Sequence, residues 1–113
     1  MVTNARSRKS GDAVFAALAD PRRRRILSLL ARRPAAVHEL SRQFRVSRPA
    51  ISRHLRVLKN ADLVGMRKRA TENIYVLKTE RLRLVESWLR PFWATRLFDL
   101  KTLAEGSWHE REN

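Results

Sequence analysis

Arginine and serine side chains gather at the start of one short stretch, SRPAISRHLRVLKN (47–60). An arginine guanidinium can donate to O6 and N7 of guanine together, and a serine hydroxyl can bond to a base edge. We therefore predict contacts with base edges in a DNA major groove for Ser47, Arg48, Pro49, Ser52 and Arg53. Contact with phosphate alone is the alternative for both arginines, because backbone contacts take half or more of protein–DNA hydrogen bonds.

Further basic and hydroxyl side chains suit the phosphates on either side of such a groove. They belong to Ser41, Arg42, Arg56, Lys59, Arg67, Lys68 and Arg69. The last three lie in a predicted β-hairpin, described below, and would contact the DNA backbone where this hairpin crosses an adjacent minor groove. Basic residues in a hairpin can also be a solvated, solubilising surface, so their type alone does not assign them a contact.

The spacing of apolar residues indicates which elements hold these side chains. Ile51, Leu55 and Leu58 recur at the helical period and predict a buried face on a helix that Ser47 caps and that ends near residue 60. The segment AVHELSRQF (36–44) predicts another short helix just before it. Two short helices joined by so brief a turn form a helix-turn-helix, which presents its second helix to a major groove.

The rest of the chain predicts a mainly α fold with one small β-hairpin. Asp12 can cap a first short helix, and Asp20 followed by Pro21 begins a second, which ends at Pro34. Apolar residues then alternate, which predicts strands over 64–69 and 73–78 around the loop ATEN. Thr79 can cap a long last helix. Pro91 should kink this helix or divide it in two.

The positive charge is unevenly distributed along the chain. The formal net charge is +14, and residues 21–69 hold 15 lysines or arginines against two acids. Residues 91–113, in contrast, hold three basic residues against four acidic ones. The large positive net charge favours a polyanionic partner, with nucleic acid as the first candidate and an anionic membrane surface as the second. The segregation indicates a DNA-binding part followed by an association part, although charge runs are often only a solvated face.

These motifs together carry a resemblance to a known family. ALADPRRRRIL (17–27), VSRPAISRHLRVLK (46–59) and ADLV (61–64), followed by a basic hairpin, resemble the ArsR (arsenical-resistance repressor) family of transcription regulators. The resemblance runs from about residue 17 to 77 and implies a winged helix-turn-helix fold with a two-stranded wing. It also implies a homodimer that represses by occluding a promoter, with the two recognition helices in successive major grooves of an inverted-repeat operator.

The segment WLRPFW (88–93) looks like a metal-independent branch of that family. Metal-sensing members use cysteines, or carboxylates and histidines along the last helix, whereas this chain has no cysteine and only His109 in its C-terminal segment. A chelating site needs several ligands that converge on one ion, so no metal and no cofactor are expected. Residues 1–11 are polar and basic without periodicity, which predicts a flexible arm, followed by a single winged helix-turn-helix domain with its dimerisation helices (12–105) and a flexible tail (106–113).

A row of large apolar side chains predicts the dimer interface. It consists of Phe15, Leu18, Trp88, Leu89, Phe92, Trp93, Leu97 and Leu100. Phe15 and Leu18 are expected to meet the C-terminal row across a two-fold axis. The aromatic residues could instead line a ligand pocket, but a small chain with a large apolar surface more often covers it with a partner. No residue identifies a small-molecule or protein effector.

Other functional classes receive less support. The chain has no paired-carboxylate motif, no Gly-rich phosphate loop and no cysteine nucleophile, so it is not expected to be an enzyme. A non-specific architectural DNA-binding or RNA-binding protein is the main alternative. No apolar run approaches the ~20 residues of a membrane span. The lack of cysteine fits the reducing cytoplasm, where we expect this protein.

Overall fold

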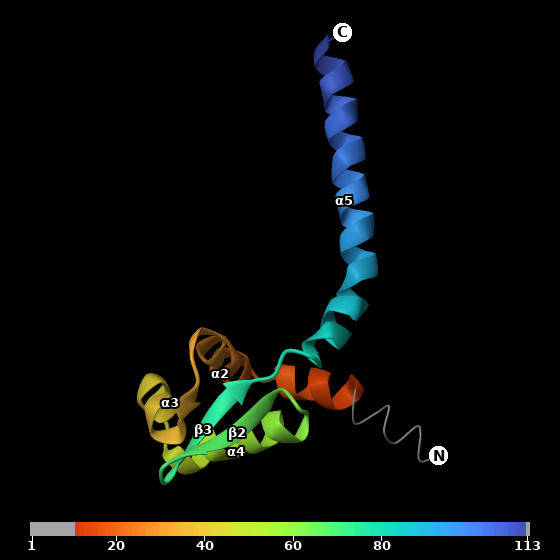
Figure 1. Ribbon diagram of the computed structural model, residues 1–113. Helices are drawn as coiled ribbons and strands as arrows, with labels where there is room; N and C mark the ends of the chain where they lie inside the picture. The colour runs from red at the N-terminus through yellow and green to blue at the C-terminus, as the bar shows by residue number, and fades with distance from the viewer. Residues whose placement is uncertain (1–10, 113) are drawn as a thin grey trace, which may run out of the picture.

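The computed structural model describes residues 11–112, except for the side chains of residues 95–100, 102 and 105–112. Residues 11–18 form a first helical segment, and the remaining elements follow in the order that Figure 1 shows. They are α2 (Pro21–Arg32), β1 (Ala35–Ala36), α3 (Val37–Phe44), α4 (Arg48–Asn60), β2 (Val64–Arg69), β3 (Glu72–Leu77) and α5 (Leu82–Glu112).

The predicted start of α2 is confirmed. The Asp20 carboxylate accepts hydrogen bonds from the backbone N–H groups of Arg22 and Arg23, at 2.8 and 3.2 Å, and Pro21 occupies the first turn. These donors would otherwise lack partners, since the first N–H groups of a helix have none inside it. At the other end, Arg33 is already extended before Pro34, so the helix ends where the sequence indicated.

The core lies where the four N-terminal helices meet the sheet. Ile51, Leu55 and Leu58 are completely buried, which confirms the predicted inner face of α4. They belong to one apolar cluster with side chains from the segment 11–18, α2 and α3, such as Val14, Ile26 and Leu40. This packing holds α4 by one side and leaves its other side at the surface.

The predicted two-stranded hairpin is present as β2 and β3, and a third strand that was not predicted, β1, pairs with β3. The order is β1-β3-β2, all antiparallel, and Ala35 and Ala36 pair with Tyr75 and Ile74. The prediction that a helix includes Ala36 was therefore wrong, because α3 begins one residue later. A strand of two residues is too short to show an alternating pattern, and its partner lies far along the chain.

The hairpin turn is shorter than predicted. Arg69 pairs with Glu72, so only Ala70 and Thr71 separate the strands, whereas the sequence predicted the four-residue loop 70–73. Ala70 takes a positive φ of 58°. Tight hairpin turns need this left-handed geometry and usually place glycine or asparagine there. An alanine gave no such signal, and the loop length was misjudged for that reason.

The ends of two helices also differ from the predictions. The first segment is already helical at residue 11, so Asp12 lies inside it and does not cap it. Helix α5 begins at Leu82, three residues after Thr79, so the residue that was predicted as its cap does not directly precede it, although the Thr79 carbonyl accepts from the Leu82 N–H at 3.0 Å. The helix continues through Pro91 as a single element, which excludes two separate helices, while the kink stays a prediction.

An ion pair joins the sheet to the turn after α4. Asp62, with a φ of 61°, accepts from Lys78 Nζ at 2.6 Å and lies 3.6 Å from Arg81 Nε. The hydrogen bond from Lys78 lowers the pKa of Asp62 below its ordinary value of 3.8. These contacts connect the end of β3 and the start of α5 to the turn that follows α4.

Candidate nucleic-acid interface

The start of α4 is exposed and holds no negatively charged residue. The Ser47 hydroxyl accepts from the Ala50 N–H at 3.3 Å, and the first turn holds a proline and no acidic residue. The N-terminus of a helix carries partial positive charge and free N–H groups, which favours phosphate. The N-terminus of α4 and the arginines in its first two turns therefore favour the same kind of ligand, an anion.

Most of the candidate base-contacting residues lie at the surface. Ser47, Arg48, Pro49 and Arg53 are exposed, and Ser52 is half-buried. Within the part of the chain that the structure describes, neither arginine side chain has a hydrogen bond or ion pair with another residue. The guanidinium groups of Arg48 and Arg53 are therefore free to donate to an external acceptor.

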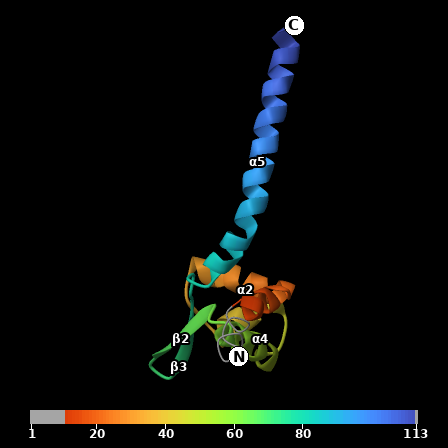
Figure 2. The same ribbon diagram turned by 90° about the vertical axis from the view of Figure 1, so that its right-hand side faces the viewer.

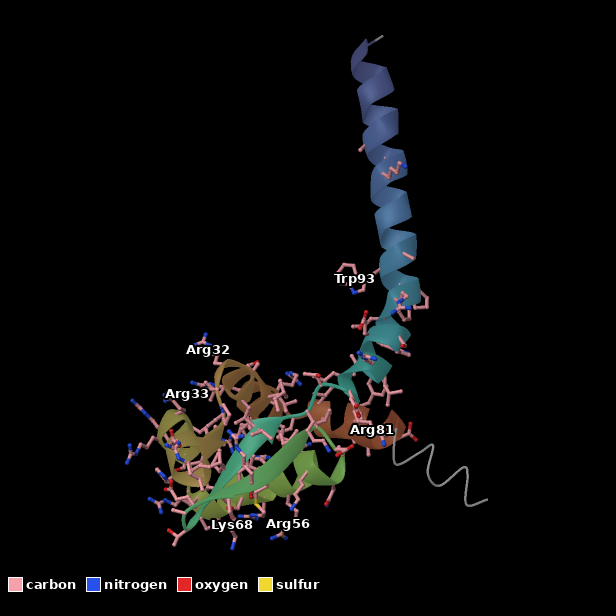
Figure 3. The ribbon with its side chains drawn as sticks, viewed as in Figure 1. Arg32, Arg33, Arg56, Lys68, Arg81 and Trp93 are labelled. Carbon is pink, nitrogen blue, oxygen red and sulfur yellow. The ribbon has the colours of Figure 1, made fainter. Side chains whose placement is uncertain are left out.

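The candidate phosphate contacts divide into two groups. Arg42, Arg56 and Lys59 are exposed on α3 and α4, while Ser41 is half-buried and its hydroxyl donates to the His38 carbonyl at 3.1 Å. Figure 3 shows Arg56 and the wing residue Lys68 on the same side of the molecule, and shows Arg32 and Arg33 on another. One wing cation, Lys68, thus lies on the same side of the molecule as Arg56 of α4 in this view.

The other two wing cations face differently. Lys68 pairs with Asn73, whereas Arg67 and Arg69 pair with Ile74 and Glu72, and neighbouring residues of a strand point to opposite faces. Arg67 and Arg69 line a hollow of about 250 Å³ with Arg33, Pro34, Glu39 and Ile74. The three hairpin cations that were predicted as one group therefore do not share one surface.

A bond that the sequence did not suggest ties the wing to the helix-turn-helix. His38 Nε2 lies 2.6 Å from Glu72 Oε1, and both residues line a hollow of about 170 Å³ that also includes Arg48 and Asn73. His38 itself is half-buried. The contact joins residues 34 positions apart, so no local motif could have indicated it.

The aromatic row on α5 is largely uncovered. Trp88, Phe92 and Trp93 are 56 to 59 % exposed, and a groove of about 460 Å³ runs along Leu82, Val85, Glu86, Leu89, Arg90 and Trp93. Figures 1 and 2 show α5 leading away from the other elements. So much exposed aromatic surface on one projecting helix is typical of an association surface.

One predicted contact of this row is made within a single chain. Phe15 packs edge-on against Trp88, with ring centroids 5.6 Å apart, and Trp88 lies 5.0 Å from Phe92. The sequence had placed the meeting of Phe15 with the row across a two-fold axis. Leu18 and Leu89 are half-buried, while the side chains of Leu97 and Leu100 lie outside the described residues.

The described residues contain no group of three histidine, aspartate or glutamate side chains that could hold a metal ion. The side chain of His109 lies outside the described part of the chain. Among the described residues, no helix combines the length and the apolar character that crossing a membrane requires.

Comparisons with known proteins agree with this geometry. Residues 20–65 match the model of a bacterial regulatory protein family, the arsR family. The chain is 45 % identical over 89 residues to the HTH-type transcriptional regulator Rv2034 of Mycobacterium tuberculosis, covering 79 % of this chain and 83 % of that protein. It is 34 % identical to the transcriptional repressor SdpR of Bacillus subtilis, covering 70 % and 88 % of the two chains.

Solved structures show the same architecture. The homodimeric winged helix-turn-helix DNA-binding domain Mb0332 of Mycobacterium bovis matches with a TM-score of 0.64 and 31 % identity. The match covers 71 % of this chain and 75 % of that domain. The fold is thus a winged helix-turn-helix in which α3 and α4 form the helix-turn-helix and β2 and β3 form the wing.

Proposed function

This chain belongs to the arsR family of bacterial regulatory proteins, and we propose that it is a transcriptional regulator that binds double-stranded DNA at specific sequences. The observation that carries the proposal is the two-sided α4. Its inner face is fixed by three fully buried side chains, while Arg48 and Arg53 are exposed without an internal partner. A helix held in this way can enter a major groove at a set depth.

Within that groove, we assign base contacts to Arg48, Ser52 and Arg53, with Ser47 and Pro49 at the edge. Arg42, Arg56, Lys59 and Lys68 are assigned to phosphates, since they are exposed on the elements around α4. Ser41 is also assigned to a phosphate. Because its short side chain is half-buried, it can reach only a phosphate that lies close to the surface of α3. Arg67 and Arg69 are also proposed for the backbone, from the other face of β2.

We also propose that the protein acts as a homodimeric repressor in the cytoplasm. SdpR is named as a repressor and Mb0332 as a homodimer, and the exposed row on α5 offers the apolar surface that a dimer would bury. A two-fold symmetric protein reads two related half-sites about one helical turn apart, so the proposed operator is an inverted repeat. Occupying such a site within a promoter would exclude the polymerase.

Competition between DNA duplexes tests the proposal, with Arg53→Ala as the informative variant. Sites are first selected from random DNA, and the selected duplex then competes with excess random duplex in a binding titration. The wild-type protein should keep the selected site. Arg53→Ala should weaken binding to that site by ~1 to 3 kcal/mol and relax the preference at one base pair.

Lys59→Ala serves as the matched control on the same helix. Loss of a phosphate contact should weaken binding to all duplexes about equally, without a change in base preference. If Arg53→Ala behaved in this way as well, Arg53 would be a backbone contact. If the wild-type protein bound selected and random duplexes equally, the protein would instead be a non-specific architectural DNA-binding protein, and the proposed regulation would be wrong.

The proposed dimer has its own test. Trp88→Ser combined with Phe92→Ser should convert the protein from a dimer to a monomer in sedimentation at micromolar concentration, because both rings are more than half exposed. Neither ring belongs to the buried core, so the variant should still unfold cooperatively, with a midpoint lowered by the loss of the dimer and of the Phe15–Trp88 contact. Leu103→Ser, a change of an equally exposed side chain further along α5, measures how far the interface extends. A wild-type protein that sediments as a monomer would refute the dimer.

A further inference from the structure

Four consecutive arginines at the start of α2 have separate surroundings. Arg25 stacks over the Phe44 ring at 4.9 Å, and Arg24 Nη1 donates to the carbonyls of Leu18 and Ala19 at 2.7 and 3.2 Å. Arg23 differs from them because its side chain is only 17 % exposed. Arg23, Arg24 and Arg25 therefore do not serve one common contact.

The Arg23 guanidinium bonds to the end of the first helical segment. Its Nε donates to the Ala17 carbonyl at 2.7 Å, and its Nη2 donates to the Ala16 carbonyl at 3.1 Å. The last carbonyls of a helix have no partner within it and carry the negative end of its dipole. A cation that donates two hydrogen bonds there both satisfies these groups and holds the segment 11–18 against α2.

The third nitrogen of the same group reaches the recognition helix. Arg23 Nη1 lies 3.5 Å from His54 Nδ1, and His54, which precedes the core residue Leu55 in α4, is half-buried. Arginine can only donate, so this bond requires Nδ1 to accept and its proton to be on Nε2. The same nitrogen, Nη1, also lies 3.9 Å from Asp20 Oδ2 and forms an ion pair with this carboxylate. One planar group therefore contacts the segment 11–18, the cap of α2 and helix α4.

From this arrangement we infer that Arg23 is a positioning residue, which fixes the recognition helix relative to the segment 11–18 through His54. The inference rests on the proposed function. In the proposed dimer, the segment 11–18 lies next to the association surface, because Phe15 packs on Trp88. The link from this segment to α4 then sets the distance between the two recognition helices. Arg23 thereby determines which half-site spacing the dimer accepts, although it does not contact DNA.

The experiment measures binding to a series of selected operators whose half-sites are moved apart or together one base pair at a time. The wild-type protein should prefer one spacing. Arg23→Met keeps the length of the side chain and removes the three hydrogen bonds of the guanidinium. It should reduce the preference for that spacing roughly five- to tenfold, the effect of losing the one hydrogen bond that reaches α4. Binding to an isolated half-site should stay within about twofold of wild type, because Arg23 touches no DNA.

Arg24→Met is the matched control. It removes the same charge and two hydrogen bonds to the carbonyls of Leu18 and Ala19, and among the described residues the Arg24 side chain has no hydrogen bond or ion pair with α4. Its spacing preference should equal that of the wild type. An equal loss in both variants would overturn the inference, because capping of the segment 11–18 would then explain the effect without any link to α4.

Two variants of His54 keep the test valid if Arg23→Met fails to fold. His54→Leu removes the acceptor and should lose the spacing preference, while His54→Asn places an oxygen near the position of Nδ1 and should restore it. Equal spacing preference in wild type, Arg23→Met and His54→Leu would overturn the inference and leave the proposed function intact. A wild-type protein without preference for any duplex would instead overturn the proposed function.

Discussion

The affinity of this protein for DNA is expected to fall by roughly three to five powers of ten as salt rises from about 50 to about 200 mM. The physical reason is counterion release. Each lysine or arginine that neutralises a phosphate frees condensed cations from the duplex, and added salt opposes this release. Each protomer offers Arg42, Arg56, Lys59 and Lys68 at the surface around α4, so a dimer would make about 6 to 10 such contacts.

The measurement is a series of binding titrations at increasing salt, plotted as the logarithm of the association constant against the logarithm of salt concentration. Arg56→Gln should reduce the slope by about one for each protomer that loses a phosphate contact. Arg32→Gln is the control. It removes the same charge from an exposed position that Figure 3 shows away from Arg56 and Lys68, so the slope should not change. A flat salt dependence would contradict the whole basic interface.

A charge at the centre of the α4 packing should unfold the protein. Leu55 is 0 % exposed, and no charged or polar residue is buried among the described residues that form the core around it. Leu55→Asp would bury a carboxylate without a partner and leave part of the space of the leucine empty. Each effect costs several kcal/mol, whereas a small domain has only about 5 to 15 kcal/mol of stability in total.

Circular dichroism during thermal unfolding checks this expectation. Leu55→Asp should show no cooperative transition, while Leu55→Ala should retain one, with stability reduced by about 2 to 5 kcal/mol. Val57→Asp introduces the same charge on the same helix at a position that is 39 % exposed, and it should unfold close to the wild-type temperature. If Leu55→Asp unfolded at the same temperature as Val57→Asp, the burial of the α4 inner face would not explain how this helix is held.

Contacts between distant parts of the chain mark the limit of what the sequence could predict. The His38–Glu72 and Arg23–His54 pairs join residues 34 and 31 positions apart, and each partner is a common surface residue type with no pattern around it. Strand β1 has only two residues, and the hairpin turn uses Ala70 in a geometry that alanine rarely adopts. The positions of the wing cations followed from the register of that hairpin, which the sequence left uncertain.

The sequence by itself determined the local elements and the two sides of the recognition helix. A cap such as Asp20 or Ser47 acts on N–H groups two or three residues away, and the buried face of α4 repeats every three or four residues, so both signals lie within one helix. Only the tertiary structure decided that Arg23 joins three elements and that Phe15 meets Trp88 in its own chain. Those contacts depend on how packed helices are placed in space, and side-chain type and spacing along one helix carry no information about that placement.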